Sequence, residues 1–238
     1  MSRPFLVVDT EGVDAFNHND GKAHGESALF YDFGAIVADR EGRVYERFSF
    51  ANSDVITNKK LMSSAYYADK LPQYFAGIGT EWQLADTLTI WETVQSVCKE
   101  YGIRDVWAFN ARYDQQSTNF TIAQKSNGFR RYFLPYKTGW RDIWDYSGST
   151  ICNTKKYVNW CYKNEFVTES GNPRTNADTV GKYILQDLEF NEQHTALSDC
   201  EIELKILLAA FKRNKKARHS KGQGWRDAAK IAKELGYK

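Results

Sequence analysis

The segment Phe5-Leu-Val-Val-Asp9-Thr-Glu11 decides the fold class that the sequence predicts. Its four consecutive apolar residues are typical of a strand buried on both faces of a sheet, and we expect Asp9 to stand where that strand ends. Side chains alternate along an extended chain, so Asp9 and Glu11 point to the same side. There they offer the oxygen ligands that hard divalent cations prefer, although two acids at this spacing also occur as solvated residues at a strand end.

Four further segments have the composition of strands. Residues 30–38 and 43–50 are rich in β-formers and are separated by Asp39-Arg-Glu-Gly42, which predicts a hairpin. Residues 105–109, which are apolar after Asp105, predict another short strand, and a last strand is expected within 134–143. Three strands therefore come first in the chain, and two more follow a helical region.

Spaced apolar residues predict helices between and after these strands. The expected helices lie at 58–75, 81–101, 111 onward, 175–188 and 195–211. The second of them carries a stripe that ends at Gly102 and consists of Leu84, Leu88, Trp91, Val94 and Cys98. The polar segment 17–26 is predicted to be a loop close to the first two acids. The sequence predicts no architecture for residues 151–176.

A third acid, Asp114, belongs to the motif Asn110-Ala-Arg-Tyr113-Asp114. The motif directly follows the strand predicted at 105–109 and opens the next helix, so a strand-to-helix corner delivers this carboxylate. Asp and Asn are also common near helix starts as capping residues, which is the alternative interpretation.

The motif His194-Thr-Ala-Leu-Ser-Asp199 opens the last long helix. Asp199 shares a helix face with Ile202, Ile206 and Ala210, so it is expected to face protein, where a carboxylate needs a cation, a metal or several donors. Five residues correspond to about 500° of helical rotation, so His194 cannot share that face and is expected to precede the helix. From a loop it can accept a proton from a nearby water; an ordinary surface histidine is the alternative.

The composition favours a globular domain in a reducing compartment. The chain has 238 residues, of which 42% are hydrophobic and 15% aromatic, and no apolar run approaches the roughly 20 residues of a membrane-spanning helix. The N-terminus lacks the features of a secretory signal. The cysteines form no Cys-x-x-Cys pair, so neither a zinc knuckle nor a disulfide framework is predicted. We expect a soluble, cytoplasmic protein.

Charge is distributed unevenly along the chain. Residues 212–238 contain ten Lys or Arg and two acids, a local excess of +8, and since the whole chain carries +2 the rest carries −6. This tail either binds phosphates or forms a solvated surface. It contains a helical stripe of Trp225, Ala228, Ala229, Ala232 and Leu235. We expect one main domain at 1–211 and a basic, partly helical extension at 212–238.

In chain order, the three acidic motifs resemble those of the DEDDh 3′-5′ exonucleases, a family of the ribonuclease H-like superfamily. Asp-x-Glu lies on the first strand, Asn-x-x-Tyr-Asp at a mid-chain strand-to-helix corner, and His-x-x-x-x-Asp at the start of a late helix. A sister branch of the family has a tyrosine four residues before the last Asp, where this sequence has Thr195, so His194 selects the DEDDh branch. The match spans residues 5–211.

The resemblance implies an α/β fold of the ribonuclease H-like type. Its mixed five-stranded sheet would have three antiparallel strands continued by two parallel ones, flanked by helices. The carboxylates would gather at one edge of this sheet.

The resemblance also implies two Mg²⁺ or Mn²⁺ ions about 4 Å apart, which activate water and stabilise the attacking and leaving oxygens of the terminal phosphodiester. Asp9 would bridge the ions, Glu11 and Asp199 would complete one site, and Asp114 would support the other. His194 would act as general base.

The terminal nucleotide is expected to meet five residues near the acids. These are Gly12, Val13, Phe16, Asn110 and Tyr113. A residue with a small hydroxyl side chain often follows the motif Glu in the family; Gly12 lacks that hydroxyl but keeps a backbone N–H. Phe16 is the aromatic side chain most expected to stack on a base.

The expected function is removal of 5′-mononucleotides from a nucleic-acid 3′ end, with single-stranded ends favoured. The choice between DNA and RNA stays open, because motif spacing does not report contacts near the 2′-hydroxyl. Two alternatives also stay open: a proofreading subunit bound to a polymerase, and a nucleic-acid-binding module without catalysis. A polymerase or a second copy of the chain is a possible protein partner, and no membrane is expected.

Overall fold

The computed structural model describes residues 3–16, 25–213 and 224–237. The chain forms two compact units: unit 1 comprises Met1–Arg141 with His194–Cys200, and unit 2 comprises Asp142–Gln193 with Glu201–Lys238. Most of the loop predicted at 17–26 and the first part of the basic tail lie outside the described residues. The division of the chain at residue 211 stays a prediction.

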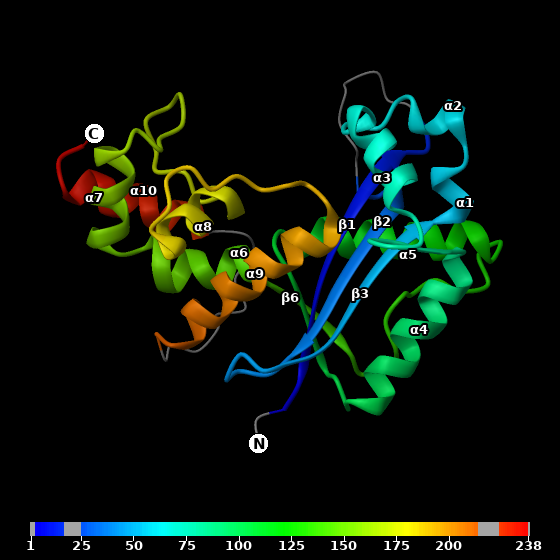
Figure 1. Ribbon diagram of the computed structural model, residues 1–238. Helices are drawn as coiled ribbons and strands as arrows, with labels where there is room; N and C mark the ends of the chain where they lie inside the picture. Colours follow the sequence, from blue (N-terminus) through cyan, green and yellow to red (C-terminus); the bar gives the residue numbers. More distant parts are fainter. Residues whose placement is uncertain (1–2, 17–24, 214–223, 238) are drawn as a thin grey trace. The chain divides into compact units, whose positions relative to one another are not determined.

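A six-stranded mixed sheet forms the centre of unit 1, in the order β4-β3-β2-β1-β5-β6 (Figure 1). The pairs β1–β2 and β2–β3 are antiparallel, whereas β1–β5 and β3–β4 are parallel. The strands are β1 (Phe5–Asp14), β2 (Ala28–Ala38), β3 (Val44–Asn52), β4 (Gln83–Ala85), β5 (Asp105–Ala108) and β6 (Gly139–Asp142). The predicted fold class, a mixed sheet flanked by helices, is confirmed.

Two expectations about this sheet are wrong. The first strand does not end at Asp9 but continues to Asp14, because a register shift between Glu11 and Gly12 lets the pairing with β2 go on. The segment 81–101 is not wholly helical, because Gln83–Ala85 forms the sixth strand. The helix begins only after Asp86, whose carboxylate caps it by accepting a hydrogen bond from the backbone of Thr89 at 2.7 Å.

The helices of unit 1 that precede β4 are short, and the two helices that follow it are longer. They are α1 (Ser53–Ile56), α2 (Lys59–Met62), the 3₁₀-helix η1 (Ala68–Lys70), α3 (Leu71–Gly77), α4 (Thr87–Glu100) and α5 (Ala111–Lys125). The helix expected at 58–75 is thus three pieces. The hydroxyls of Ser63 and Ser64 donate to carbonyls three residues earlier, which competes with continued helix formation.

Helices are the main regular elements of unit 2 in its described part. Its elements are α6 (Ile143–Ser147), the π-helix η2 (Gly148–Cys152), α7 (Lys155–Lys163), α8 (Ala177–Leu185), α10 (Gly224–Glu234) and most of α9 (Ala196–Phe211). Helix α10 packs against α6, η2 and α7, burying Ala228 and Ala232. Three residues after the end of α10, Tyr237 stacks on Tyr162 of α7 with ring centroids 3.8 Å apart. The second half of the basic tail therefore packs within unit 2.

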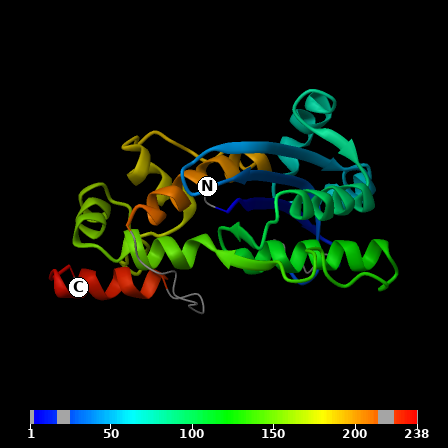
Figure 2. The ribbon, with the colours of Figure 1, turned by 90° about the horizontal axis from the view of Figure 1, so that it is seen from below.

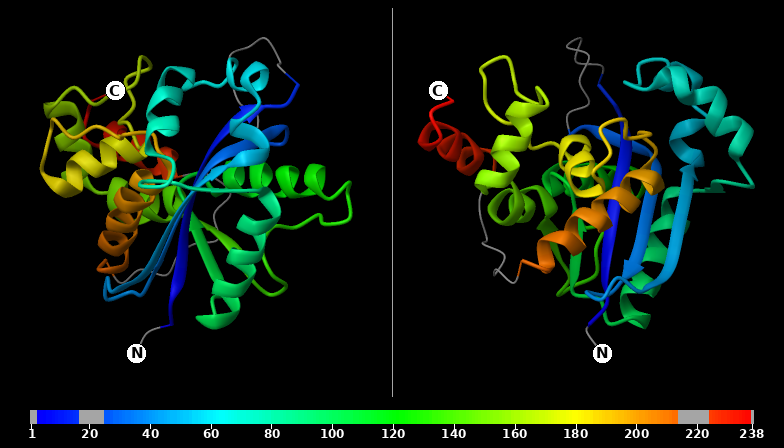
Figure 3. Two further views of the ribbon diagram at one scale, coloured as in Figure 1. Left: turned by 45° about the vertical axis from the view of Figure 1, so that its right-hand side comes forward. Right: turned by 60° about the vertical axis from the view of Figure 1, so that its left-hand side comes forward.

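The two faces of the sheet in unit 1 carry different partners. Helices α4 and α5 cover one face (Figure 2), where Leu6 and Val8 share a hydrophobic core with Ile90. Because side chains alternate along a strand, Asp9 and Glu11 point to the opposite face. The first turn of α9 lies on that opposite face (Figure 3).

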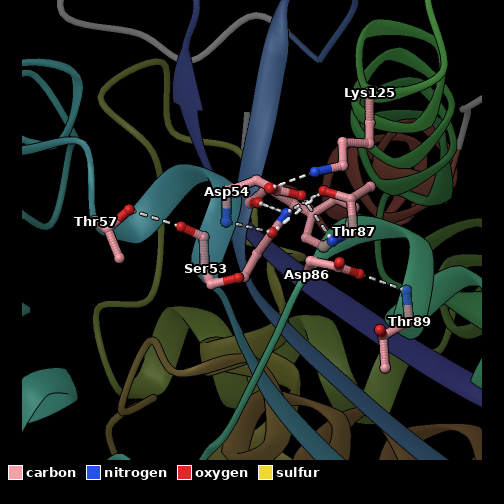
Figure 4. A network of polar contacts seen from close by, with 9 residues as sticks. Ser53, Asp54, Thr57, Asp86, Thr87, Thr89 and Lys125 are labelled. Atoms are coloured by element: carbon pink, nitrogen blue, oxygen red, sulfur yellow. Dashed lines mark hydrogen bonds and ion pairs between the residues drawn. The ribbon is translucent and has the colours of Figure 1, made fainter.

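A polar network joins the ends of three elements of unit 1 (Figure 4). Asp54 of α1 accepts hydrogen bonds from the backbone of Thr87 at 2.9 Å and from Lys125 at 2.6 Å. Burial alone would raise the pKa of Asp54, but these donors outweigh it and lower the pKa below its ordinary value. The start of α4 and the end of α5 are therefore held to one carboxylate.

Within residues 3–16, 25–213 and 224–237, no helix combines the length and apolar character that crossing a membrane requires.

Candidate functional site

The start of α9 lies directly on β2 at Gly34. A Cβ atom at Gly34 would lie 2.3 Å from the carbonyl carbon of Ala196 and 2.3 Å from the backbone nitrogen of Leu197, so glycine is the residue that leaves room for the helix. Gly34 is the partner of Asp9 in the β1–β2 register. Further along α9, the Cys200 Sγ atom lies 3.8 Å from the carbonyl oxygen of Val7. The first turns of α9 thus cross β2 and β1 beside the acids of β1.

Asp32 holds this helix start from the sheet. Its fully buried carboxylate accepts hydrogen bonds from the backbone of Ala196 at 2.8 Å, from the hydroxyl of Tyr74 at 2.7 Å and from the indole of Trp82 at 3.2 Å. Burial raises the pKa of Asp32 to about 6 despite these donors. Asp32 is also the register partner of Glu11.

Three of the predicted site residues form one tight group. Ligand atoms of Glu11, His194 and Asp199 all lie within 4.8 Å of one another. The Nδ1 atom of His194 lies 3.8 Å from an Asp199 carboxylate oxygen. The prediction that His194 precedes the helix is confirmed: it has a left-handed backbone conformation (φ 51°), and α9 begins at Ala196.

The electrostatics of this group disfavour negative charge. Burial raises the pKa of Glu11 well above its usual range, and the charges of Asp199 and Asp32 raise it further, against the opposing effect of Lys70. Burial likewise raises the pKa of Asp199 to about 6, although hydrogen bonds from Ser198 and the backbone of His194 act the other way. Clustered buried carboxylates need positive charge nearby, which a divalent cation supplies.

Asp114 approaches β1 from the α5 face. It lies in the first turn of α5, is buried, and accepts a hydrogen bond from the hydroxyl of Thr10 at 2.9 Å. Thr10 stands between the two acids of β1 and points to the opposite side from them. Asp9 and Asp114 lie outside the 4.8 Å group, but the charge of Asp114 still contributes to the raised pKa of Glu11.

Tyr113 connects this side of the site to Gly12. Burial raises the pKa of Tyr113, and the charges of Asp114, Glu11 and Asp9 add to it in that order, so the phenol lies among the acids. A Cβ atom at Gly12 would lie 2.5 Å from the Tyr113 hydroxyl. The absence of a side chain after the motif Glu is therefore what allows this tyrosine to reach the site.

The other expected substrate contacts are differently placed. Val13 is buried in a hydrophobic cluster with Tyr31, so its side chain is not available to a nucleotide. Phe16 is 64% exposed and lies edge-on to Phe120 of α5, with ring centroids 6.0 Å apart. Asn110 is exposed and left-handed (φ 61°) at the corner before α5. Their roles stay predictions.

The sequence interpretation missed three residues beside the tight group. The imidazole of His194 stacks on the ring of Tyr67, with centroids 4.7 Å apart and planes at 15°, and the ammonium of Lys70 lies 5.0 Å from the same ring. Asp32 is the third. Asp32 had a signal, since it is a charged residue inside the apolar run of β2. Tyr67 and Lys70 had none, because only the fold brings them to His194.

Comparison with known proteins identifies the fold. No protein-family model matches the chain, and no curated protein matches its sequence. Several solved structures of E. coli exonuclease I are similar. The zinc-bound complex with single-stranded DNA has a TM-score of 0.59 at 15% identity, and the complex with a dA16 oligonucleotide has 0.57 at 17%. Each match covers 92% of this chain and 42% of the exonuclease I chain, so this chain spans less than half of that protein.

Proposed function

We propose that the chain is a metal-dependent 3′-5′ exonuclease of the DEDDh type. The observation that carries this proposal is the approach of Glu11, His194 and Asp199 to within 4.8 Å, where β1 meets the start of α9. The fold shared with exonuclease I supports it, since structures of that protein hold a dA16 oligonucleotide in one case and single-stranded DNA in another.

The acids would hold two divalent cations, Mg²⁺ or Mn²⁺. The donor set fits such ions, because it consists of carboxylates whose charged forms are disfavoured by burial and by one another. Glu11 and Asp199 would hold one ion, Asp9 would bridge, and Asp114 would support the other. When bound, the ions would activate the attacking water and stabilise charge on the oxygens of the scissile phosphodiester.

The remaining residues would orient the reactants and move the proton. His194 would take the proton of the attacking water, since its side chain is partly exposed and lies beside Asp199. The ring of Tyr67 would fix the orientation of the His194 imidazole, because the two rings stack. Tyr113 and the backbone N–H of Gly12 would contact the terminal nucleotide, and Phe16 and Asn110 lie in the exposed positions around them.

The products would be 5′-mononucleotides, and single-stranded 3′ ends would be the preferred substrate. Attack on the terminal phosphodiester leaves the phosphate on the released nucleotide. Offering both DNA and RNA to the purified chain distinguishes the two substrates.

The test offers 5′-labelled single- and double-stranded DNA and RNA to the purified chain, with Mg²⁺, Mn²⁺ or EDTA. A ladder that shortens from the 3′ end only in the presence of metal is the expected result. Internal cuts, or activity that resists EDTA, would overturn the proposal. Turnover by the isolated chain would also separate it from a subunit that acts only when bound to a polymerase.

Two matched variants assign the activity to the proposed site. Glu11→Gln removes a ligand and is expected to abolish the ladder, whereas Glu92→Gln makes the same chemical change at an exposed position on α4 and should leave it intact. Equal activity in the two variants would place the chemistry elsewhere.

A further inference from the structure

The loop between α5 and β6 carries exposed aromatic side chains. We call residues 126–138 the aromatic-basic loop. Phe129, Tyr132 and Tyr136 are 85%, 74% and 91% exposed, although they lie within eight residues of one another. Large aromatic side chains usually contribute to a core, so three exposed together mark an interaction surface.

The same loop is positively charged, although residues 1–211 as a whole carry a net charge of −6. From residue 115 to 141 the chain contains five Lys or Arg and no Asp or Glu. The first and last of these cations are neutralised, because Lys125 pairs with Asp54 and Arg141 with Asp105. Arg131 and Lys137 are exposed, and neither forms an ion pair with another described residue.

The backbone of the loop is fixed while these side chains project. Buried Phe133 anchors it, since its N–H donates to Asn119 at 2.8 Å and its carbonyl accepts from Gln95 at 2.6 Å. Arg130 lies over the ring of Trp91 on α4 at 4.5 Å. A surface held in place in this way loses little conformational entropy when it binds a ligand.

Helix α5 connects this loop to the candidate site. Asp114 lies in the first turn of α5, and the loop begins directly after its last residue, Lys125 (Figures 1 and 3). Eleven residues of helix span about 16 Å. A stacked single strand advances about 3.4 Å per nucleotide, so about five nucleotides cover this distance.

We propose that the aromatic-basic loop binds single-stranded nucleic acid about five or more nucleotides upstream of the 3′ end. Phe129, Tyr132 and Tyr136 stack on bases, and Arg131 and Lys137 contact phosphates. Aromatic stacking combined with cations that follow the backbone is the general chemistry of single-strand recognition, and it tolerates any sequence. The inference rests on the proposed function only in taking the 3′ end to lie at the acids.

The test measures the affinity for 5′-labelled dT3, dT12 and rU12 by fluorescence anisotropy in EDTA, so that no cleavage is needed. A trinucleotide is too short to reach the loop. The wild-type chain is expected to bind dT12 or rU12 much more tightly than dT3. The double variant Phe129→Ala, Tyr132→Ala should weaken binding of the 12-mers about tenfold or more and leave dT3 unchanged.

The charges are tested separately with a matched pair of variants. Arg131→Ser, Lys137→Ser should reduce the slope of log affinity against log salt for dT12 by about 1.4, the value for two lost phosphate contacts on a single strand. Lys60→Ser, Lys99→Ser removes the same charge from exposed positions on α2 and α4 and should leave the slope near that of the wild type.

The outcomes separate this inference from the proposed function. Equal binding of 12-mers by wild type and loop variants overturns the inference, whether or not the chain degrades nucleic acid. Loop variants that bind 12-mers normally but lose self-association in sedimentation would assign the loop to a second copy of the chain and equally overturn it. If binding in EDTA depends on oligonucleotide length and on the loop, but the chain cleaves no nucleic acid when Mg²⁺ or Mn²⁺ is added, the role of the loop is supported and the exonuclease is contradicted.

Discussion

Glu11 and Asp32 face each other across β1 and β2, and Asp199 lies close to both. Like charges placed directly opposite in a sheet destabilise it, and burial strengthens the repulsion. Asp32 accepts hydrogen bonds from three protein donors. The tight group, in contrast, brings together two acids, Glu11 and Asp199, and His194. The residues themselves therefore divide into one structural carboxylate and one group suited to cations.

His194→Ala separates proton transfer from metal binding. If His194 is the general base, the variant should lose about 10²- to 10⁴-fold in kcat and keep most of its affinity for Mn²⁺. Single-turnover kinetics and calorimetric titration of Mn²⁺ measure the two effects. A wild-type rate at neutral pH would remove the role of His194, and a large loss of Mn²⁺ affinity would make it a ligand instead.

Gly12→Ala tests the contact between β1 and Tyr113. The new Cβ would lie 2.5 Å from the Tyr113 hydroxyl, so the substitution should lower the free energy of unfolding by about 1–3 kcal/mol. In a Tyr113→Phe background the hydroxyl is gone, and the same substitution should cost clearly less. Urea unfolding of the four proteins in this double-mutant cycle measures the coupling, and additive effects would refute the contact.

Among the helices and strands, the contact between the start of α9 and β2 positions the residues of the site. Gly34 permits the helix start to touch the sheet, and Asp32 accepts the first backbone N–H of the helix. The position of Asp199 relative to Glu11 depends on this contact, because Asp199 is in the first turn of α9. A change of a single atom beneath the helix should therefore affect residues that it does not touch.

Gly34→Ala puts that dependence to the test. Its Cβ would meet backbone rather than a mobile side chain, so the free energy of unfolding should fall by about 3 kcal/mol and Mn²⁺ affinity should fall with it. Gly139→Ala is the matched control, since a Cβ there meets no atom within 4 Å. Urea unfolding and Mn²⁺ titration give both readouts. A Gly34→Ala protein that behaves like Gly139→Ala would contradict the close contact between α9 and Gly34.

At the scale of the whole molecule, the buried acids link stability to pH and to cations. The pKa of Asp199 and of Asp32 is raised from 3.8 to about 6, and that of Glu11 is also raised. Between about pH 4 and 6 the folded chain holds protons that the unfolded chain has lost. The stability that these protonated groups contribute is complete below about pH 4 and is lost as the pH rises through about 6.

Melting curves with and without Mn²⁺ follow from this linkage. Mn²⁺ should raise the apparent melting temperature more at pH 7.5 than at pH 5, because protons compete with the cation at low pH. In EDTA at pH 7.5, Asp199→Asn should melt higher than the wild type, by about 3 °C for each kcal/mol of relieved charge burial. That gain should vanish near pH 5.

Asp69→Asn provides the control for this prediction, because it neutralises an exposed carboxylate in the same unit. Its melting temperature should not change with pH relative to the wild type. A destabilised Asp199→Asn protein in EDTA at pH 7.5 would show that the site does not disfavour negative charge.

Local patterns in the sequence were sufficient to predict much of the fold, and the resemblance of the three motifs to one family, rather than the patterns alone, led us to expect Glu11, His194 and Asp199 in one site. Runs of β-forming and apolar residues predicted β2, β3 and β5, and helical spacing predicted α5 and α9, because these signals depend only on neighbours along the chain. The angular spacing from His194 to Asp199 correctly placed the histidine before the helix. Local pattern failed at the end of β1 and at β4, where pairing with a neighbouring strand decides the structure.

Neighbours along the chain are enough to assign each acid to its strand or helix and to give the order of the acids. Three contacts depend instead on the tertiary structure: the approach of Glu11, His194 and Asp199, the packing of α9 on Gly34, and the stacking of Tyr67 on the His194 imidazole. Such contacts join segments more than a hundred residues apart. They depend on the packing of a helix across a sheet, which leaves no periodic signal in the sequence.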